Sequence, residues 1–185
     1  MTTPAVGPTL TTERMVLTPP VLTDFDDFHA LWSDPQVVRH IGGRPFTEED
    51  DWKRLSMLAG SWVLHGMGYW TARDRADGRF VGQIGVAMNR RALPTQFVAS
   101  FSPYPETGWV MQPQAQGRGL ATEGALAAVA WADAALGAER TVCLIAPANA
   151  ASLRVAERCG YRRYAETEYH GEPTVLLERF RPQPG

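Results

Sequence analysis

The residues best suited to chemistry form a glycine-containing turn, Gln116-Gly117-Arg118-Gly119-Leu120-Ala121-Thr122, between a strand-like run and an alanine-rich helical run. The first amides of a helix have no acceptor within the helix, and the helix dipole favours negative charge at that end. Two glycines let a phosphate approach the main chain closely, and Thr122 adds a hydroxyl. The turn therefore predicts a phosphate site, while a glycine turn that only redirects the chain stays open as the alternative.

Two common nucleotide-binding motifs do not fit this turn. A P-loop needs Lys followed by Ser or Thr after its last glycine, where this chain has Leu120-Ala121. A dinucleotide-binding turn needs a third glycine, where this chain has Thr122, and an acidic residue about 20 positions further on. Asp133 does not supply that acid, because it lies inside the predicted helix. Binding of another nucleotide at the same turn is kept as an alternative.

The turn is positioned by an alternation of predicted strands and helices. Short apolar or alternating runs predict strands at 14–18, 68–73, 79–88, 106–111, 140–146, 161–168 and 174–180. Start signals and apolar spacing predict helices that begin near Asp24 and Thr47 and helices over 120–136 and 150–159. The proline-containing residues 89–105 are predicted as a looser connection. This order predicts the α/β (α+β) class, one mixed sheet of about seven strands flanked by about four helices, with 13–182 as one domain and 1–12 as a disordered or extended tail.

Composition excludes several classes of protein. The chain has 185 residues and 20.4 kDa, with 44% hydrophobic and 21% charged residues, values typical of one soluble globular domain. A net charge of −2 and a pI near 6.1 argue against a nucleic-acid binder that relies on positive charge. Cys143 and Cys159 form no CxxC pair and the four histidines form no HxxxH pair, so we expect neither a metal site nor a disulfide framework.

No targeting or membrane segment is predicted. The first thirteen residues contain no Lys or Arg and no long apolar run, unlike a secretory signal. The most apolar stretch, 124–138, is interrupted by Asp133 and is shorter than the roughly 20 residues that a membrane span needs. We therefore expect a cytoplasmic protein with no membrane partner.

At the glycine turn the chain resembles a known family. Gln116-x-x-Gly119-x-Ala121 is similar to the Q/R-x-x-G-x-G/A signature of the Gcn5-related N-acetyltransferases (GNAT family), whose loop holds the pyrophosphate of acetyl-coenzyme A. Further matches occur in the family's order: residues 11–19 with Asp24 and 33–35, then 106–110, then Asn149-x-x-Ser152 ahead of 159–161. They cover residues 11–181 and look like the branch that acetylates ribosomal-protein N-termini, typified by the ribosomal-protein-alanine N-acetyltransferases. The resemblance implies a mostly antiparallel sheet splayed beside the loop, acetyl-CoA as cosubstrate, and by analogy a homodimer.

The resemblance also implies a cofactor-binding set. The loop would hold the pyrophosphate, and the main chain of Trp109 and Met111 would pair with the pantetheine arm as an added strand. The Met111 amide would polarise the thioester carbonyl, and one such donor is worth roughly 3–4 kcal/mol in acyl transfer. The implied phosphate-loop residues are Gln116, Gly117, Arg118, Gly119, Leu120, Ala121 and Thr122. Arg154 and Arg158, four positions apart on one helix, are further candidates for the phosphates.

Asn149 and Ser152 follow the strand that ends near residue 146. In the family this Asn holds the pantetheine amide, and in this branch the Ser gives a proton near the sulfur. Ordinary helix capping by Asn149, with Ser152 in the first turn, is the alternative. Many relatives place a Tyr seven residues after the Asn, where this chain has Ala156, which weakens the case for a general acid.

Glu106 is the candidate general base. An amino terminus with a pKa near 8 is mostly charged at pH 7 and must lose a proton before it attacks. A carboxylate within hydrogen-bond reach, or one water away, can take that proton. An exposed acid at a strand end beside Pro105, with water and a backbone carbonyl taking the proton, is the alternative.

These residues predict an N-acetyltransferase that moves an acetyl group from acetyl-CoA to a primary amine by direct attack in a ternary complex. The acceptor would be a protein or peptide N-terminus or a small amine. A non-catalytic acyl-CoA-binding sensor or regulatory module is the alternative, and the Ala at position 156 permits it.

Overall fold

The computed structural model describes residues 6–182, which form one eight-stranded sheet with helices on both faces. The strand order is β1-β2-β3-β4-β5-β6-β8-β7, and neighbours are antiparallel except for the parallel pair β5 and β6. The strands are β1 (Leu10–Thr11), β2 (Met15–Thr18), β3 (Tyr69–Asp74), β4 (Phe80–Ala87), β5 (Glu106–Met111), β6 (Arg140–Ile145), β7 (Arg162–Tyr169) and β8 (Glu172–Phe180). The predicted class, one mostly antiparallel α/β sheet, is confirmed.

The described part of the chain contains six α-helices and two 3₁₀ turns. The helices are α1 (Phe25–Trp32), α2 (Pro35–Val38), α3 (Glu48–His65), α4 (Thr95–Phe101), α5 (Leu120–Ala135) and α6 (Ala150–Arg158), and the turns are η1 (Leu22–Asp24) and η2 (Pro113–Ala115). The predicted helix starts are local in origin. Thr47 and Asp50 form a reciprocal capping box at the start of α3, and left-handed Gly66 ends that helix.

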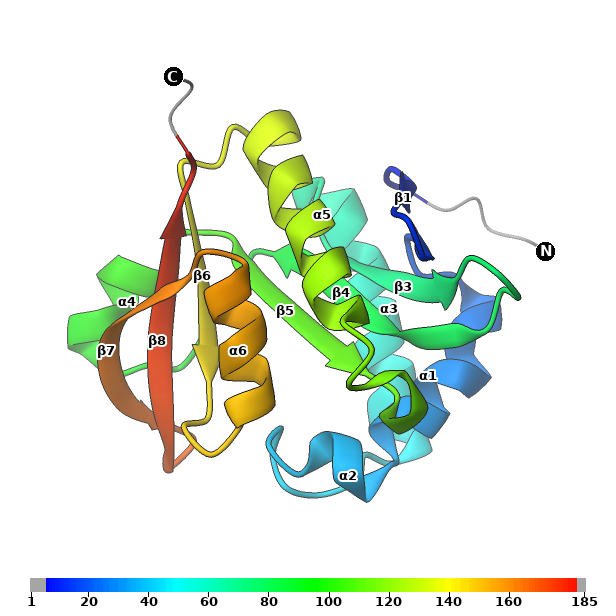
Figure 1. The fold of residues 1–185 in the computed structure, drawn as a ribbon. Coiled ribbons are helices and arrows are strands. Elements are labelled where there is room, and N and C mark those ends of the chain that lie inside the picture. The colour runs from blue at the N-terminus through cyan, green and yellow to red at the C-terminus, as the bar shows by residue number, and fades with distance from the viewer. Residues whose placement is uncertain (1–5, 183–185) are drawn as a thin grey trace.

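Helices cover the two faces of the sheet unequally (Figure 1). α5 and α6 lie on one face, and α1, α3 and α4 lie on the other. Small residues let α5 lie close to β4, because a Cβ at Gly124 would overlap the side chain of Ile84. Ala128 and Ala132 on the same helix are fully buried in the core.

The sheet opens between β5 and β6. The only residues paired across these two strands are Glu106 and Val142, at the start of β5. Beyond that pair the strands diverge toward α2, as Figure 1 shows. One side of β5 therefore has no strand partner over most of its length.

The structure has three short elements more than the predicted seven or so strands and four or so helices, namely β1, α2 and α4. α4 lies within the stretch 89–105, which was predicted as a loose connection. It was not predicted as a helix because its sequence, TQFVASF, has weak helix propensity. Its helix is stabilised by packing instead, since Phe101 is buried with Val142 and Leu176. β1 lies in the predicted tail, of which residues 1–5 are outside the described part of the chain.

None of the helices in residues 6–182 is long and apolar enough to cross a membrane.

Candidate active site

A cavity of about 590 Å³ lies where the sheet opens. It joins the end of β5, the turn before α5, the start of α6 and the segment 36–41. Twelve residues proposed from the sequence lie in its wall: Trp109, Met111, Gln116, Gly117, Gly119, Leu120, Ala121, Thr122, Asn149, Ser152, Arg154 and Arg158. Glu106 and Arg118, also proposed, are not among the lining residues.

The main-chain groups of Trp109 and Met111 point away from β4. The Gln112 N–H donates to the Val81 carbonyl at 3.0 Å, so Met111 and Gly82 are a non-hydrogen-bonded pair of the antiparallel ladder. Trp109 faces Ile84 two residues earlier and has the same orientation. Both residues therefore direct their N–H and C=O groups toward the opening beside β6. The Met111 carbonyl accepts a hydrogen bond from the Gln116 side chain at 3.1 Å.

The turn before α5 places unpaired amides at the cavity. Gly117 and Gly119 have φ values of 72° and 79°. Residues other than glycine rarely adopt this left-handed backbone conformation. Gly119 is the N-cap, and its carbonyl accepts the first helical hydrogen bond, from the Glu123 N–H. The amides of residues 120–122 precede that bond and have no acceptor within the helix. Arg154 and Arg158 line the same cavity, so the positive end of the α5 dipole and two cationic side chains both face it.

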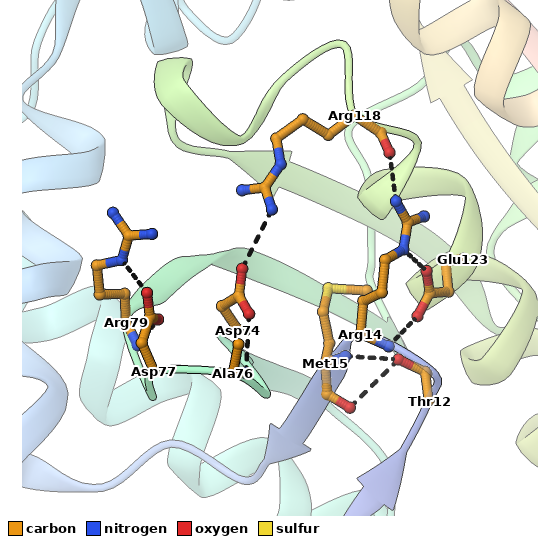
Figure 2. A network of polar contacts seen from close by, with 9 residues as sticks. All are labelled: Thr12, Arg14, Met15, Asp74, Ala76, Asp77, Arg79, Arg118 and Glu123. Atoms are coloured by element: carbon orange, nitrogen blue, oxygen red, sulfur yellow. Dashed lines mark hydrogen bonds and ion pairs between the residues drawn. The ribbon is translucent and has the colours of Figure 1, made fainter.

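A polar network holds this turn to the start of β2 (Figure 2). The Arg14 guanidinium donates to the Arg118 carbonyl at 2.7 Å and to the Glu123 carboxylate at 2.6 Å. The Arg14 amide also donates to Glu123, at 2.8 Å. The Arg118 side chain turns away from the cavity toward Asp74, with 3.2 Å between Nη2 and Oδ2. Arg118 thus contributes its main chain to the turn, and its side chain fixes the turn from outside.

Asn149 and Ser152 form the α6 side of the cavity. The Asn149 side chain accepts from the Ser152 amide at 3.1 Å, which is the capping role given as the alternative. Asn149 and Ser152 both line the cavity, and the cap occupies the Asn149 amide oxygen and leaves its NH₂ group free of this contact. The Trp109 indole donates to the Ser152 hydroxyl at 3.3 Å and so joins β5 to α6.

Glu106 is buried, with 4% of its surface exposed, and is not the exposed acid considered as the alternative. Its two carboxylate oxygens accept from Arg91 at 2.8 and 2.5 Å. Arg91 lies in the segment between β4 and α4, and it also donates to the Tyr169 hydroxyl at 3.2 Å. No local pattern in the sequence indicates that Arg91 is the partner of Glu106.

Tyrosines on either side of β5 are structural. Burial raises the pKa of the Tyr69 hydroxyl, and the nearby Glu106 carboxylate adds to that effect. Gly108 is required beside it, because a Cβ there would overlap that hydroxyl. Tyr161 is 4% exposed and donates to Thr107 at 2.7 Å. Burial also raises its pKa, which keeps it protonated at neutral pH.

Sequence reasoning missed the wall opposite α6. Gln36, Val37, Arg39, His40 and Ile41 line the cavity there. The signal was present, because Asp34 caps the Gln36 amide at 2.7 Å and Pro35 is at the first helical position. The helices predicted from the sequence do not include Pro35–Val38, and residues 33–35 were used for the family resemblance.

The family model described as "Acetyltransferase (GNAT) domain" matches residues 14–162. The chain belongs to the GNAT family of acetyltransferases. Membership in this family implies acyltransferase activity. GNAT enzymes use acetyl-CoA as the acetyl donor. The cavity fits that cosubstrate, because a strand edge suits its amide-containing arm and a helix N-terminus with two arginines suits its phosphates.

Individual GNAT relatives cover most of the chain. A structure assigned to the GNAT family from Bordetella pertussis is 35% identical, with a TM-score of 0.81 over 93% of this chain and 99% of that one. An acetyltransferase from Agrobacterium tumefaciens is 26% identical, with a TM-score of 0.80 over 94% and 95% of the two chains. The FsC-acetyl coenzyme A-N(2)-transacetylase of Aspergillus fumigatus is 30% identical over 83% of this chain, and the match spans 64% of that enzyme.

More distant structures agree in fold alone. They include Vibrio spermidine and ribosomal-protein acetyltransferases at 14–17% identity. The GNAT family is thus shown, whereas the ribosomal-protein branch stays a prediction. Among residues 6–182, no three His, Cys, Asp or Glu side chains are grouped so as to hold a metal ion.

Proposed function

We propose that this protein transfers an acetyl group from acetyl-CoA to a primary amine by direct attack in a ternary complex. One observation carries the proposal: a single cavity joins the outward-facing main chain of β5 to the N-terminus of α5. A strand edge binds an extended amide-containing chain, and a helix N-terminus binds phosphates. Acetyl-CoA contains both groups and supplies the activated acetyl group when bound.

The residues that would hold the cosubstrate lie along this cavity. The amides that begin α5 would bind the pyrophosphate, with Arg154 and Arg158 nearby. Trp109 and Met111 would pair with the pantetheine arm, and the Met111 amide would donate to the oxygen that gains charge during transfer. Asn149 would donate to a pantetheine amide. Ser152 would give a proton to the departing thiolate, a modest aid because a thiol with a pKa near 8.5 already leaves readily.

Glu106 would take the proton of the acceptor amine through a water molecule. Arg91 donates one hydrogen bond to each oxygen of Glu106. An ionised carboxylate offers about four acceptor positions, so about two remain for a water molecule.

A protein or peptide N-terminus is the first acceptor we propose, and a small amine is the second. Support for the first is the fold shared with the Vibrio ribosomal-protein enzymes, and support for the second is the fold shared with a spermidine enzyme. A thiol-release assay over peptides, polyamines and aminoglycosides would separate them. Tight acetyl-CoA binding with no turnover on any amine would favour the sensor module instead.

The variant Gly119→Glu tests the phosphate site. It places bulk and negative charge at the start of α5, so we expect the affinity for acetyl-CoA to fall at least about 100-fold, or about 2.8 kcal/mol. The measurement is titration calorimetry with acetyl-CoA.

Gly137→Glu is the matched control. Gly137 follows the other end of α5 in the same left-handed conformation, with a φ of 62° and open space around it. The control carries the same strain and charge away from the cavity, so its affinity should match that of the unmodified protein. Equal affinities for all three proteins would refute the phosphate site.

A further inference from the structure

Gln83 is a buried amide with one unused donor. It lies in β4 on the face opposite α5, because its neighbour Ile84 points toward α5, and it is 1% exposed. Its Oε1 accepts from the Trp32 indole at 3.1 Å. An indole N–H only donates, so the amide oxygen must face Trp32 and the NH₂ group must face away. That Nε2 atom is buried and has no hydrogen-bond partner in the described part of the chain.

Arg54 places an unpaired charge beside the same indole. Its guanidinium lies 3.8 Å from the Trp32 ring centroid and 5.2 Å from that of Phe46. Its Nε is buried with no partner, and no ion pair within residues 6–182 includes Arg54. Burial lowers the pKa of this arginine, although the group remains fully charged at neutral pH. The side chain as a whole is half-buried, so its charge is partly shielded from water and has no acidic partner among residues 6–182.

Both groups lie next to the reaction cavity. Gln83 pairs with Val110 of β5, and Val110 lines the cavity between Trp109 and Met111. The Phe46 amide donates to the Trp32 carbonyl at 3.2 Å, which anchors the segment whose residues 36–41 form the cavity wall. Of the other arginines, Arg91 is neutralised by Glu106, and Arg73 pairs with Asp24 and Asp27. Arg39 also lines the cavity, but Arg54 is the cation that lies against the indole to which Gln83 is hydrogen-bonded.

We propose that Arg54 and Gln83 bind a carboxylate of the acceptor, so that the amine acetylated by this protein carries a carboxylate. The inference rests on the proposed acetyltransferase function and specifies its acceptor. A carboxylate accepts from a guanidinium and an amide NH₂ at once, which satisfies both unused donors. A polyamine would bring a second cation toward Arg54 and is disfavoured. The carboxylate belongs either to a free amino acid or to a peptide, as an acidic side chain or the C-terminus.

Paired acceptors that differ only in this group test the proposal. Thiol release is measured for an amino acid and its carboxamide, and for a tripeptide with Glu or Gln at its second position and an amidated C-terminus. We expect one carboxylate member to exceed its neutral partner at least about 30-fold in kcat/KM, the scale of one buried charged hydrogen bond, and the preferred pair identifies the source. Equal rates within both pairs would overturn the proposal.

Variants assign the preference to these two residues. Arg54→Met should raise KM for the carboxylate acceptor at least about tenfold with little change in kcat, and should leave the neutral partner unaffected. Lys53→Met is the control, because Lys53 is the adjacent residue of α3 and is exposed, with an ion pair only to Glu49. Gln83→Glu keeps the oxygen that Trp32 needs and removes the donor, so it should reverse the preference toward the neutral amine. It also keeps the proposal falsifiable where Arg54→Met is unstable.

Calorimetry separates failure of this inference from failure of the proposed function. Protein saturated with CoA is titrated with each N-acetylated acceptor and its carboxamide. Carboxylate-selective binding that Arg54→Met abolishes supports the subsite even where no amine is turned over, and the proposed transfer alone then fails. Turnover of amines without carboxylate selectivity in rate or in binding retains the transfer and overturns the subsite.

Discussion

At the scale of single residues, function depends on partners that are remote in sequence. Glu106 resembles a solitary acid at the start of a strand, yet it is buried and shares both oxygens with Arg91, fifteen positions earlier. The ion pair has one buried and one partly exposed member, with side-chain exposures of 5% and 29%. Removing one partner would leave a largely buried charge uncompensated.

The pair Glu106→Gln and Glu106→Gln/Arg91→Gln separates catalysis from structure. The single variant should lose about 2 kcal/mol of unfolding free energy, reduced from the usual cost of a broken buried pair because Arg91 is partly exposed. The double variant should recover most of that stability. If Glu106 is the base, both variants should be slower by at least about 100-fold, with the greatest loss at low pH where the amine is most charged. Recovery of activity together with stability in the double variant would assign Glu106 a structural role.

At the scale of elements, the glycine turn before α5 is held by a strand that begins about a hundred residues earlier. Arg14, at the entry to β2, contacts the Arg118 carbonyl and Glu123 of α5. Burial opposes ionisation of Glu123, but hydrogen bonds from Thr12 and Arg14 hold the pKa of its carboxyl below the ordinary value of 4.5. The network thus couples the shape of the turn to the charge of one carboxyl group.

This network should give the protein a defined acid sensitivity. A carboxyl whose pKa is lower in the folded state stabilises the fold above the unfolded-state value, and the stabilisation is lost as pH falls through the folded-state value. We therefore expect Glu123→Gln to be less stable than the unmodified protein at pH 7 by at most about 1 kcal/mol, since Arg14 is 43% exposed. The difference should shrink below about pH 4.5, measured as thermal unfolding temperature against pH. A difference that is constant across this range would contradict the assignment.

At the scale of the whole molecule, stability and the site are spatially separate. Three tryptophans join α3, β3 and α5, with ring-centroid separations of 4.8 Å for Trp62–Trp70, 5.1 Å for Trp70–Trp131 and 5.7 Å for Trp62–Trp131. Trp70 is fully buried, and none of the three lines the reaction cavity. The opening between β5 and β6 can exist because core clusters of this kind hold the sheet on both sides of it.

Trp70→Ala should therefore reduce stability without removing the site. Deleting a buried tryptophan costs about 3–5 kcal/mol, so the urea midpoint should fall by that loss divided by the m-value. Affinity for acetyl-CoA, measured at a temperature where the variant stays folded, should be unchanged. A loss of affinity in the folded variant would mean that the tryptophan cluster shapes the cavity.

The sequence by itself determined the features that depend on neighbouring residues. The glycine turn before α5, the capped starts of α3 and α6 and most strands follow from local conformational preferences and from hydrogen bonds over three or four residues. The glycine turn and the strand β5 were predicted in this way, because glycine spacing and strand periodicity are visible in one segment, while the phosphate-binding role of the turn stays a prediction. The start of α2 at Asp34-Pro35 was equally local, and its signal was misinterpreted.

Only the tertiary structure decided what depends on segments far apart in the chain. Strand pairing opened the sheet between β5 and β6, packing made a helix of residues 95–101, and folding joined Arg14 to Glu123 and Arg91 to Glu106. It also placed a buried Gln83 and a half-buried Arg54 beside one indole, each with one buried donor that has no partner in the described part of the chain. Burial and ionic pairing are properties of the space around a side chain, and that space is filled by residues whose distance along the chain carries no local signal.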